Sequence, residues 1–356
     1  MKSIVKENGL VYCNEGAVDA FHKVLKQLQP SKVFILTDTN TRNFCLQPFL
    51  KDFGNDLDPT ILEIPAGEIH KTINTCLTVW EQLSEKGADR NSLLINLGGG
   101  VVTDLGGFVA STFKRGISFI NIPTSLLAMV DASVGGKNGV DLGMIKNQIG
   151  VIRNPELVVI QTTFLNTLPK NEVLSGFAEM LKHGLIASEG YWNKLQAFDL
   201  NLASEAEDLI WESVLIKNNV VSTDPLEKGL RKTLNYGHTL GHAIESYCLA
   251  SEEKITLLHG EAIAIGMVLA TYFSTELLDF PKQKLTQITK TLIELYGKHD
   301  FLRKDINAII DLLIYDKKNT NGKVLFVLLN DFGSHKINCE VPNTLIYKAF
   351  DYYKNF

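Results

Sequence analysis

Short apolar runs rich in β-branched residues alternate with longer segments of helical spacing through the first half of the chain. Such alternation is typical of a parallel sheet covered by helices. Apolar positions recur at helical intervals over 17–28 and 72–86, and the second segment is followed by Gly87, a residue that can end a helix in the left-handed conformation. The runs that predict strands are 32–36, 60–64, 92–97, 119–122 and 157–160.

From about Pro169 the pattern changes. Long amphipathic segments follow one another with no strand-like run between them, so we expect a second, mainly helical domain. We place the first domain at 1–169 and the second at 170–356. Near the C-terminus, 323–329 and 335–338 flank a turn and predict a small hairpin. The predicted helices of this part are 172–187, 203–221, 238–249 and 260–278.

Length and charge narrow the classes of function. A chain of 356 residues exceeds the usual size of one domain, which agrees with the two domains that the pattern predicts. The net charge of -5 argues against a nucleic-acid-binding surface, because contacts to a phosphate backbone need a basic excess or a concentrated basic face. An anionic small ligand would therefore have to be held by a local cluster of basic side chains.

The N-terminus and the cysteines bear on the compartment. The first residues hold no apolar segment typical of a signal peptide, and no later stretch of about 18 residues lacks charged or strongly polar side chains. We therefore expect a cytoplasmic protein that makes no contact with a membrane. The cysteines are odd in number, far apart and without a CxxC pair, so we expect reduced, packed thiols at Cys13, Cys45, Cys76, Cys248 and Cys339.

One strand-like run leads directly into glycines and then into a helix-like segment, over 93–104. Gly98, Gly99 and Gly100 would let backbone N–H groups approach a pyrophosphate, and the dipole of the following helix would favour its negative charge. The spacing differs from the GxGxxG of dinucleotide-binding turns. The motif alone therefore does not separate a nucleotide site from a plain tight turn.

A second glycine cluster, 131–139, contains Lys137 and is soon followed by Lys146 and Asn147. Two lysines and an amide beside a flexible backbone can form a cage for a phosphate or a carboxylate. The same residues would also suit a solvated loop with ordinary surface lysines. The local sequence leaves both interpretations open.

Histidines in the second half have the spacing of metal ligands. His238 and His242 are four residues apart and so share one face of a predicted helix, although such pairs also occur as core or capping histidines. His259 and Glu179 are further candidates, because a catalytic divalent cation needs three protein ligands and an open position. Glu179 interrupts an apolar helical face, where an unpaired carboxylate would be costly and a cation would neutralise it.

These motifs together resemble the 3-dehydroquinate synthase family of sugar-phosphate cyclases, in the same order and over nearly the whole chain. Several separate motifs in the right order are more specific than any one of them. The resemblance rests on 98–101 with Asp104, 131–137, Lys146 with Asn147, Ala178 and Glu179 with Lys182, 234–238 with His242, and 259–261.

The resemblance implies a Rossmann-like α/β domain that binds NAD, followed by a helical domain that binds zinc or cobalt, with the active site in the cleft between them. It implies that Glu179, His238 and His259 bind the metal. His242 would face the substrate instead, contrary to the simplest interpretation of the histidine pair. The positions implied to bind NAD are Gly67, Glu68, Lys71, Gly100, Val101, Val102, Thr103, Asp104, Thr124, Ser125, Lys137, Lys146, Phe164, Leu165, Asn166 and Thr167.

The reaction of this family converts 3-deoxy-D-arabino-heptulosonate 7-phosphate into 3-dehydroquinate and phosphate in the shikimate pathway. NAD oxidises a ring hydroxyl, phosphate is eliminated, the ketone is reduced again, and the ring opens and closes by an internal aldol step, so NAD is recycled. Arg115 corresponds to a residue that reaches into a neighbouring subunit, which implies a homodimer. The positions implied to handle the substrate are Asp131, Lys137, Asn147, Lys182, Lys217, Arg231, Asn235, His242 and Lys318 or its neighbour Lys317.

The chain departs from the family pattern near the glycine turn. Thr103 stands where glycine is more frequent, Gly106 stands where alanine is, and Met144 and Ile145 precede Lys146 where glycine is frequent. A positive φ at Thr103 would cost about 1 kcal/mol or more. The departures concern the fine geometry of the NAD loop rather than the assignment.

Three other functions fit parts of the pattern. A metal-dependent NAD polyol dehydrogenase would share the two-domain plan, but it would release NADH and would need no phosphate cage. A related cyclase of secondary metabolism would act on a heptulose 7-phosphate or glucose 6-phosphate, although 133–137 and Arg231 resemble the branch whose substrate carries a carboxylate. A catalytically inactive binding protein would be expected to lack part of the metal triad or the lysines, and all of them are present.

Overall fold

The computed structural model describes residues 1–6, 9–54, 57–143, 145–313 and 323–356. The chain forms two compact units. Unit 1 comprises Met1–Val173 and Asn201–Val214, and unit 2 comprises Leu174–Leu200 and Leu215–Phe356. The domain boundary placed after residue 169 stays a prediction.

Unit 1 is built on a seven-stranded sheet of order β1-β2-β9-β6-β5-β3-β4. Every neighbouring pair is parallel except β1 with β2. All residues of β5 and β9 are buried, which explains why these strands read as continuous apolar runs. The strands are β1 Lys2–Lys6, β2 Gly9–Cys13, β3 Val33–Asp38, β4 Thr60–Ile64, β5 Leu93–Gly98, β6 Ser118–Pro123 and β9 Leu157–Ile160.

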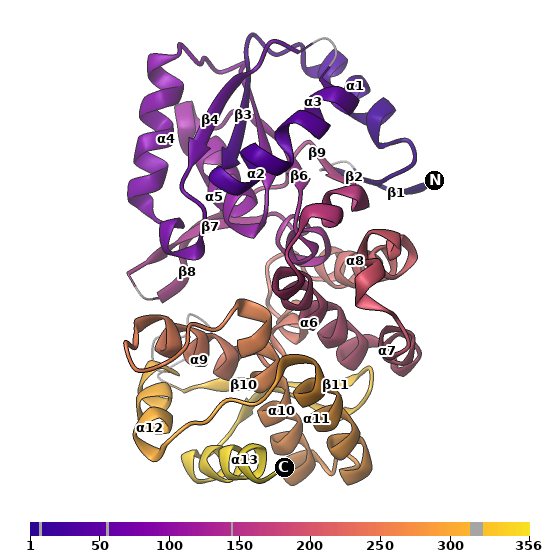
Figure 1. Cartoon of the computed structure of the whole chain (residues 1–356), viewed down its shortest axis with the longest axis vertical. Coiled ribbons are helices and arrows are strands. Elements are labelled where there is room, and N and C mark those ends of the chain that lie inside the picture. Colours follow the sequence, from indigo (N-terminus) through magenta and orange to yellow (C-terminus); the bar gives the residue numbers. More distant parts are fainter. Residues whose placement is uncertain (7–8, 55–56, 144, 314–322) are drawn as a thin grey trace. The chain divides into compact units, whose positions relative to one another are not determined.

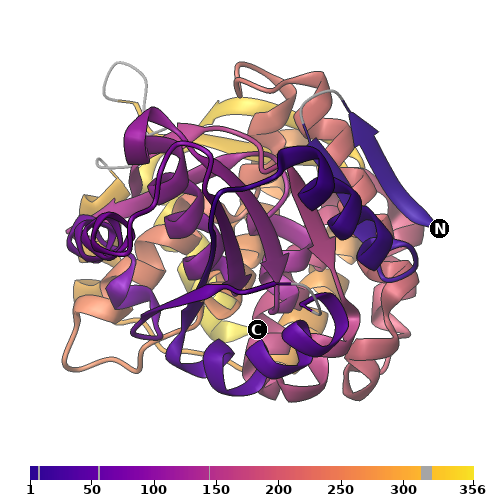
Figure 2. The same cartoon turned by 90° about the horizontal axis from the view of Figure 1, so that it is seen from above.

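Helices cover both faces of this sheet, as Figures 1 and 2 show. From β2 through β3 to β4 the chain moves toward one edge of the sheet, and from β4 through β5 to β6 it moves back. Because such crossovers are right-handed, the helices of the first set of connections lie on one face of the sheet and those of the second set lie on the other. Trp80 of α4 donates a hydrogen bond to the Val109 carbonyl of α5 (3.2 Å), within the second set. The helices are α1 Ala17–Leu28, α2 Thr39–Phe44, α3 Leu46–Phe53, η1 Glu68–His70, α4 Ile73–Glu85 and α5 Gly100–Thr112, with η2 Phe113–Arg115 after α5.

A separate hairpin of β7 Lys137–Leu142 and β8 Ile145–Ile152 packs against α5. Gly107 of α5 allows this contact, because a Cβ there would lie 1.9 Å from Oδ1 of Asn138. The glycine cluster interpreted as flexible backbone therefore ends in a strand rather than a solvated loop. Its polar and glycine residues hide the strand from a pattern of apolar alternation. The remaining segments of unit 1 are the π-helix η3 Ala128–Ala132 and the 3-10 helix η4 Thr162–Thr167.

Unit 2 is mainly helical, as predicted, and the predicted hairpin is present as β10 Leu325–Asp331 and β11 Ser334–Glu340. The predicted helix 203–221 is wrong at its start, because the chain forms the 3-10 helix η5 Leu200–Glu205 before α8 Glu207–Thr223. Ala203 and Ala206 are both buried at this break, so the apolar spacing continues across it. The other helices are α6 Lys170–Ala187, α7 Glu189–Gln196, η6 Leu230–Asn235, α9 His238–Ala250, α10 His259–Leu278, α11 Lys282–Tyr296, α12 Arg303–Leu312 and α13 Asn343–Asn355.

Helix α10 forms the core of unit 2. It is long and apolar enough to cross a membrane by length and composition, but 72% of its apolar window is buried inside the protein, as expected for a core helix. Gly266 lets α10 approach the start of α9, since a Cβ there would lie 2.0 Å from the Gly237 carbonyl oxygen. The predicted fold class, an α/β unit followed by a mainly helical one, is confirmed. The five cysteines are free and buried, which confirms the expectation of packed thiols.

Candidate functional site

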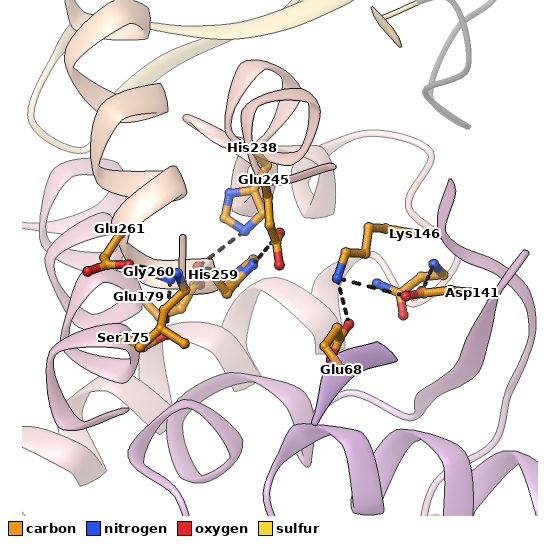
Figure 3. Close-up of polar contacts among 12 residues, drawn as sticks. Glu68, Asp141, Lys146, Ser175, Glu179, His238, Glu245, His259, Gly260 and Glu261 are labelled. Carbon is orange, nitrogen blue, oxygen red and sulfur yellow. Dashed lines mark hydrogen bonds and ion pairs between the residues drawn. The ribbon is translucent and has the colours of Figure 1, made fainter. Parts of the chain in front are cut away.

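Three predicted metal ligands meet in unit 2 (Figure 3). Glu179 lies within α6, while His238 and His259 are the first residues of α9 and α10. Glu179 Oε1 lies 3.2 Å from Nε2 of His238 and 3.5 Å from Nε2 of His259. This oxygen is buried and has no hydrogen-bond partner within the described residues, although two ring nitrogens face it. Such an arrangement of one carboxylate and two imidazoles is that of a divalent cation site.

The outer nitrogen of each imidazole has its own acceptor. His238 Nδ1 lies 3.0 Å from the Tyr236 carbonyl oxygen, and His259 Nδ1 lies 3.2 Å from Glu245 Oε2. A proton on each Nδ1 would be donated to these oxygens, which leaves the Nε2 lone pairs directed at the cation position. Histidines that ligate zinc have this kind of support, so the donor set fits a zinc or cobalt ion.

Glycines next to the two histidines let the three helices come close together. Gly237 takes a positive φ of 76° immediately before α9. A Cβ on Gly260 would lie 2.4 Å from the Cα of Ser175 in α6, and the Gly260 N–H donates to Ser175 Oγ at 3.0 Å. The start of α10 is thus fixed against the helix that carries Glu179.

Charge also points to a cation at this position. Burial alone would raise the pKa of Glu179, but the Lys182 ammonium and His238 hold that pKa well below its usual range, and Lys182 pairs directly with Glu179 Oε2. Burial lowers the pKa of His238. Burial would also lower the pKa of His259, but Glu245 and Glu179 raise it to about 10. A bound divalent cation would balance the charge of the buried carboxylates Glu179 and Glu245 in place of a proton.

His242 lies beside the other two histidines. Its ring centroid is 5.1 Å from that of His238 and 5.7 Å from that of His259. One ligand atom from each of the three histidines lies within 4.8 Å of the others, so distance alone does not exclude His242 as a ligand. Its assignment to the substrate therefore stays a prediction from the resemblance.

The predicted phosphate-binding turn in unit 1 has the expected backbone. Buried β5 ends at Gly98, and α5 begins at Gly100 with Gly99 as its N-cap. Val101 and Val102 follow in the first turn of α5, where N–H groups have no partner within the helix. Gly99 also leaves space beside Ser125, because a Cβ there would lie 3.3 Å from Ser125 Oγ. This strand, turn and helix suit the pyrophosphate of a dinucleotide.

The departures from the family pattern do not strain this turn. Thr103 has helical geometry, its N–H donates to the Gly99 carbonyl oxygen at 3.0 Å, and it is not among the residues with positive φ. The side chain of Asn96 leaves no space for a Cβ at Gly106, since that atom would lie 2.0 Å from Asn96 Oδ1. Met144 lies outside the described residues.

Several predicted NAD residues contact one another (Figure 3 shows Lys146 with Glu68). Lys146 Nζ lies 2.9 Å from Glu68 Oε1, and the buried Lys71 Nζ lies 2.7 Å from Asp104 Oδ2. Burial would lower the pKa of Lys71, but Asp104, Glu68 and Asp141 raise it above its usual value, so Lys71 carries its charge. The charged groups of η1, α5 and β8 therefore form one network around the start of α5.

The other predicted NAD positions are distributed around unit 1. The exposed Gly67 precedes η1 with a φ of 112°, and the Thr124 N–H donates to the Gly98 carbonyl oxygen at 3.0 Å. Within the described residues, no hydrogen bond or ion pair joins the η4 segment to the glycine turn. That segment holds Phe164 and Leu165, which are buried, and Asn166 and Thr167, which are exposed.

The predicted substrate residues of unit 2 include two buried lysines, Lys182 on α6 and Lys217 on α8. Arg231 is also buried and lies in η6, where its Nη1 donates to the Pro225 carbonyl oxygen at 2.8 Å. Asn235 ends η6 and donates from Nδ2 to Glu227 Oε1 at 2.8 Å. Buried cations of this kind are expected to face anionic groups.

Unit 1 holds the remaining predicted substrate residues. Asp131 lies in the π-helix η3, Lys137 begins β7, and Asn147 lies in β8 with a φ of 52°. Arg115 has a φ of 72° and is exposed, beside a cavity of about 350 Å³ lined by Asp89, Arg90, Lys114 and Arg115. Lys317 and Lys318 lie outside the described residues.

Sequence reasoning missed three carboxylates that contact predicted site residues. Glu245 supports His259, Glu227 accepts from Asn235, and Asp141 accepts from the Asn147 N–H at 2.6 Å. Glu245 had a signal, because it lies seven residues after His238 on the same face of a predicted helix. The other two had none, since their partners are brought to them by turns whose geometry the sequence does not display.

Comparisons with known proteins give one consistent family. The family model described as 3-dehydroquinate synthase N-terminal matches residues 61–175, and the one described as 3-dehydroquinate synthase C-terminal matches residues 176–319. The 3-dehydroquinate synthase of Parabacteroides distasonis is 41% identical over 352 residues, which cover 98% of this chain and 99% of the relative.

Two solved structures of sugar-phosphate cyclases have the same fold. A 2-deoxy-scyllo-inosose synthase complexed with carbaglucose-6-phosphate, NAD+ and Co2+ aligns with a TM-score of 0.81 at 26% identity, over 96% of each chain. The 2-epi-5-epi-valiolone synthase of Streptomyces hygroscopicus, with NAD+ and Zn2+ bound, aligns with a TM-score of 0.85 over 99% of this chain and 98% of its own. At 24% identity, the second likeness concerns the fold alone.

Proposed function

Because the chain belongs to the 3-dehydroquinate synthase family, we propose that it converts 3-deoxy-D-arabino-heptulosonate 7-phosphate into 3-dehydroquinate and phosphate. The observation that carries the proposal is the meeting of Glu179, His238 and His259, with an acceptor behind each imidazole, in a chain that matches the family over both halves. The proposed enzyme is a carbon–oxygen lyase that releases phosphate.

We propose NAD and a zinc or cobalt ion as its cofactors. The inosose synthase structure contains NAD+ and Co2+, which supports both. Bound to this chain, the cation would act as a Lewis acid on a substrate hydroxyl, and NAD would accept and return a hydride. Glu179, His238 and His259 would hold the cation. The first turn of α5, with Lys71, Asp104 and Lys146 beside it, would hold the dinucleotide.

The chain's own side chains would bind and orient the substrate. Its phosphate and carboxylate are anions, so the buried lysines and Arg231 of unit 2 are suitable partners. Arg231 presents a planar fork that matches a carboxylate, which favours a keto-acid over glucose 6-phosphate as substrate. His242, Asn235 and Asn147 would supply neutral hydrogen-bonding groups, and Lys137 would supply a further positive charge. We further propose a cytoplasmic homodimer in which Arg115 reaches the partner subunit.

The test measures phosphate release from the heptulosonate phosphate, with NAD+ and Zn2+ added, while absorbance reports any NADH. We expect phosphate without accumulating NADH, and we expect its release to stop on chelation and in Lys137→Ala. Net NADH formation from a simple polyol would indicate a dehydrogenase instead. Phosphate release from glucose 6-phosphate or another heptulose phosphate, but not from the keto-acid, would indicate a cyclase of secondary metabolism. Binding without turnover of any of these would indicate an inactive binding protein.

A further inference from the structure

The β7–β8 hairpin is irregular at one place. Its register runs evenly from Lys137↔Ile152 to Val140↔Ile149, then shifts before Leu142↔Ile145. Asp141 lies in this irregular stretch on β7, opposite Lys146 and Asn147 on β8. Asn147 has a φ of 52°, in the left-handed region that asparagine tolerates better than most residues. Irregularities of this kind redirect side chains and are frequent next to active sites.

Three residues close a ring of hydrogen bonds at this irregularity. The Asp141 N–H donates to the Lys71 carbonyl oxygen at 2.9 Å, and the Asn147 N–H donates to Asp141 Oδ1 at 2.6 Å. Lys71 Nζ donates to Asn147 Oδ1 at 2.7 Å, which completes the ring. Asp141 therefore holds the backbone of Asn147, while Lys71 holds its side chain.

The ring also fixes which way the amide of Asn147 points. A charged lysine can only donate, so the atom of Asn147 that faces Lys71 Nζ must be the oxygen. The ring makes no use of the Nδ2 group. Asn147 is thus set to offer a hydrogen-bond donor, rather than an acceptor, to a ligand, which suits the oxygen of a phosphate, carboxylate or hydroxyl.

The same ring is connected to the predicted dinucleotide site. Lys71 Nζ also donates to Asp104 Oδ2 of α5, at 2.7 Å. The second oxygen of Asp141 lies 3.8 Å from Lys146 Nζ, whose nearer partner is Glu68. Asp141 thus contacts both residues of β8 to which the family resemblance gives a role, one toward the cofactor and one toward the substrate (Figure 3 shows Asp141 with Lys146).

We propose that Asp141 is a positioning residue, which keeps Asn147 in its left-handed conformation with Nδ2 directed outward as a donor to substrate and keeps Lys146 in place for the dinucleotide. This inference rests on the proposed function for the identity of the two ligands. Asp141 itself touches neither ligand; it acts through the backbone of Asn147 and the charge of Lys146.

A double-mutant cycle tests whether Asp141 acts through Asn147. Asp141→Ala and Asn147→Gly, which preserves access to a positive φ, are each expected to lower kcat/KM for the heptulosonate phosphate about 10- to 100-fold, because a misplaced positioning group costs that much. The double variant should fall no lower than the worse single variant, within about threefold, since coupled residues are not additive. Effects that multiply would overturn the proposal.

Two further variants separate positioning from general damage. Asp141→Asn keeps an oxygen for the Asn147 N–H but loses the charge beside Lys146. Its kcat/KM should therefore lie within about threefold of wild type, whereas its Kd for NAD+ should be raised, as it should be in Asp141→Ala. Asp52→Ala, at an exposed position on α3, is the matched control and should change neither value. Failure of Asp141→Asn to recover more activity than Asp141→Ala would overturn the role of its oxygen.

Hydrogen exchange provides a readout that does not depend on the reaction. In Asp141→Ala, residues 141–143 and 145–150 should exchange their amide hydrogens faster than in wild type, and in Asp52→Ala they should not. Unchanged exchange would overturn the holding role. If the wild-type protein releases no phosphate from the heptulosonate phosphate, the proposed function fails, and the exchange of this segment and the Kd for NAD+ still decide the role of Asp141.

Discussion

At the residue scale, the carboxylate behind His259 has a specific role. Glu245 Oε2 accepts from His259 Nδ1 and thereby directs Nε2 toward the position shared with Glu179. Because outer partners of metal ligands typically contribute about 10- to 100-fold to metal affinity, Glu245→Gln should raise the Kd for Zn2+ by that factor. The measurement is competition with a chromophoric chelator. Glu252→Gln, an exposed substitution of the same kind, is the control and should leave the Kd unchanged. Equal affinities in both variants would contradict the role.

A contact of a single residue also explains why Gly106 stands where the family pattern more often has alanine. Gly106 lies where a Cβ would meet Asn96 Oδ1 at 2.0 Å, and Asn96 is itself buried and bonded to Asn121 at 2.8 Å. Gly106→Ala should therefore cost about 1–3 kcal/mol of unfolding free energy, as overpacked substitutions do, measured by urea titration. Gly190→Ala in α7 should not destabilise the protein, because a Cβ there would lie 3.5 Å from Ser188 Oγ, an ordinary contact distance. The double variant Gly106→Ala with Asn96→Ala should recover part of the lost unfolding free energy. If it did not, the contact between the new Cβ and Asn96 would not be the cause of the loss.

At the element scale, burial on both faces decides what the sequence can reveal. Strands β5 and β9 are buried throughout, so their apolar runs predicted them closely. The β7–β8 hairpin was not predicted, because its buried positions include Asn138, which packs against Gly107 of α5, and Gly139, which faces the backbone of β8. The ring of Lys71, Asp141 and Asn147 is built on this hairpin. No spacing in the sequence could therefore have predicted it.

The start of α12 supports a prediction about acid stability. Asp305 is fully buried and accepts from the Leu302 N–H at 2.7 Å and the Tyr247 hydroxyl at 2.6 Å, with Lys254 Nζ also at 2.6 Å. Burial would raise the pKa of Asp305, but these partners outweigh it and lower that pKa. A lowered pKa in the folded state stabilises the protein above the unfolded pKa of about 3.9, and this contribution is lost as the pH falls through the folded pKa.

Asp305→Asn should thus reduce the unfolding free energy at pH 7 by about 1–3 kcal/mol, since a buried charge-assisted pair is broken. The difference from wild type should shrink as the pH is lowered below about 4, where the wild-type carboxylate also takes up a proton. Urea titrations at pH 7, 5 and 3 measure it, with Asp311→Asn on the same helix as the control. A difference that stayed constant with pH would show that the charge of Asp305 does not provide the stability.

At the scale of the whole molecule, the order of the motifs could be read from the sequence, but the residues that hold the motif side chains in place could not. The proposed metal ligands come from the starts or middles of three helices, and the order of the motifs predicted them. Their outer partners, Tyr236 and Glu245, became visible only in the folded chain. Single motifs were ambiguous because each also fits a structural role. Their combination was informative because one catalytic purpose requires all of them.

The assignment of the two cofactors to different units gives a prediction for the whole protein. A ligand present at about 100 times its Kd stabilises the folded state by about 2.7 kcal/mol, so NAD+ and Zn2+ should each raise the unfolding midpoint. His259→Ala should abolish the effect of Zn2+ and keep that of NAD+, because His259 lies in unit 2 and the predicted NAD residues lie in unit 1. Lys146→Ala should weaken the effect of NAD+ and keep that of Zn2+. Thermal scans of both variants with each ligand measure this. Loss of both responses in either variant would mean that the two sites cannot be assigned to separate units, and loss of neither would remove His259 and Lys146 from them.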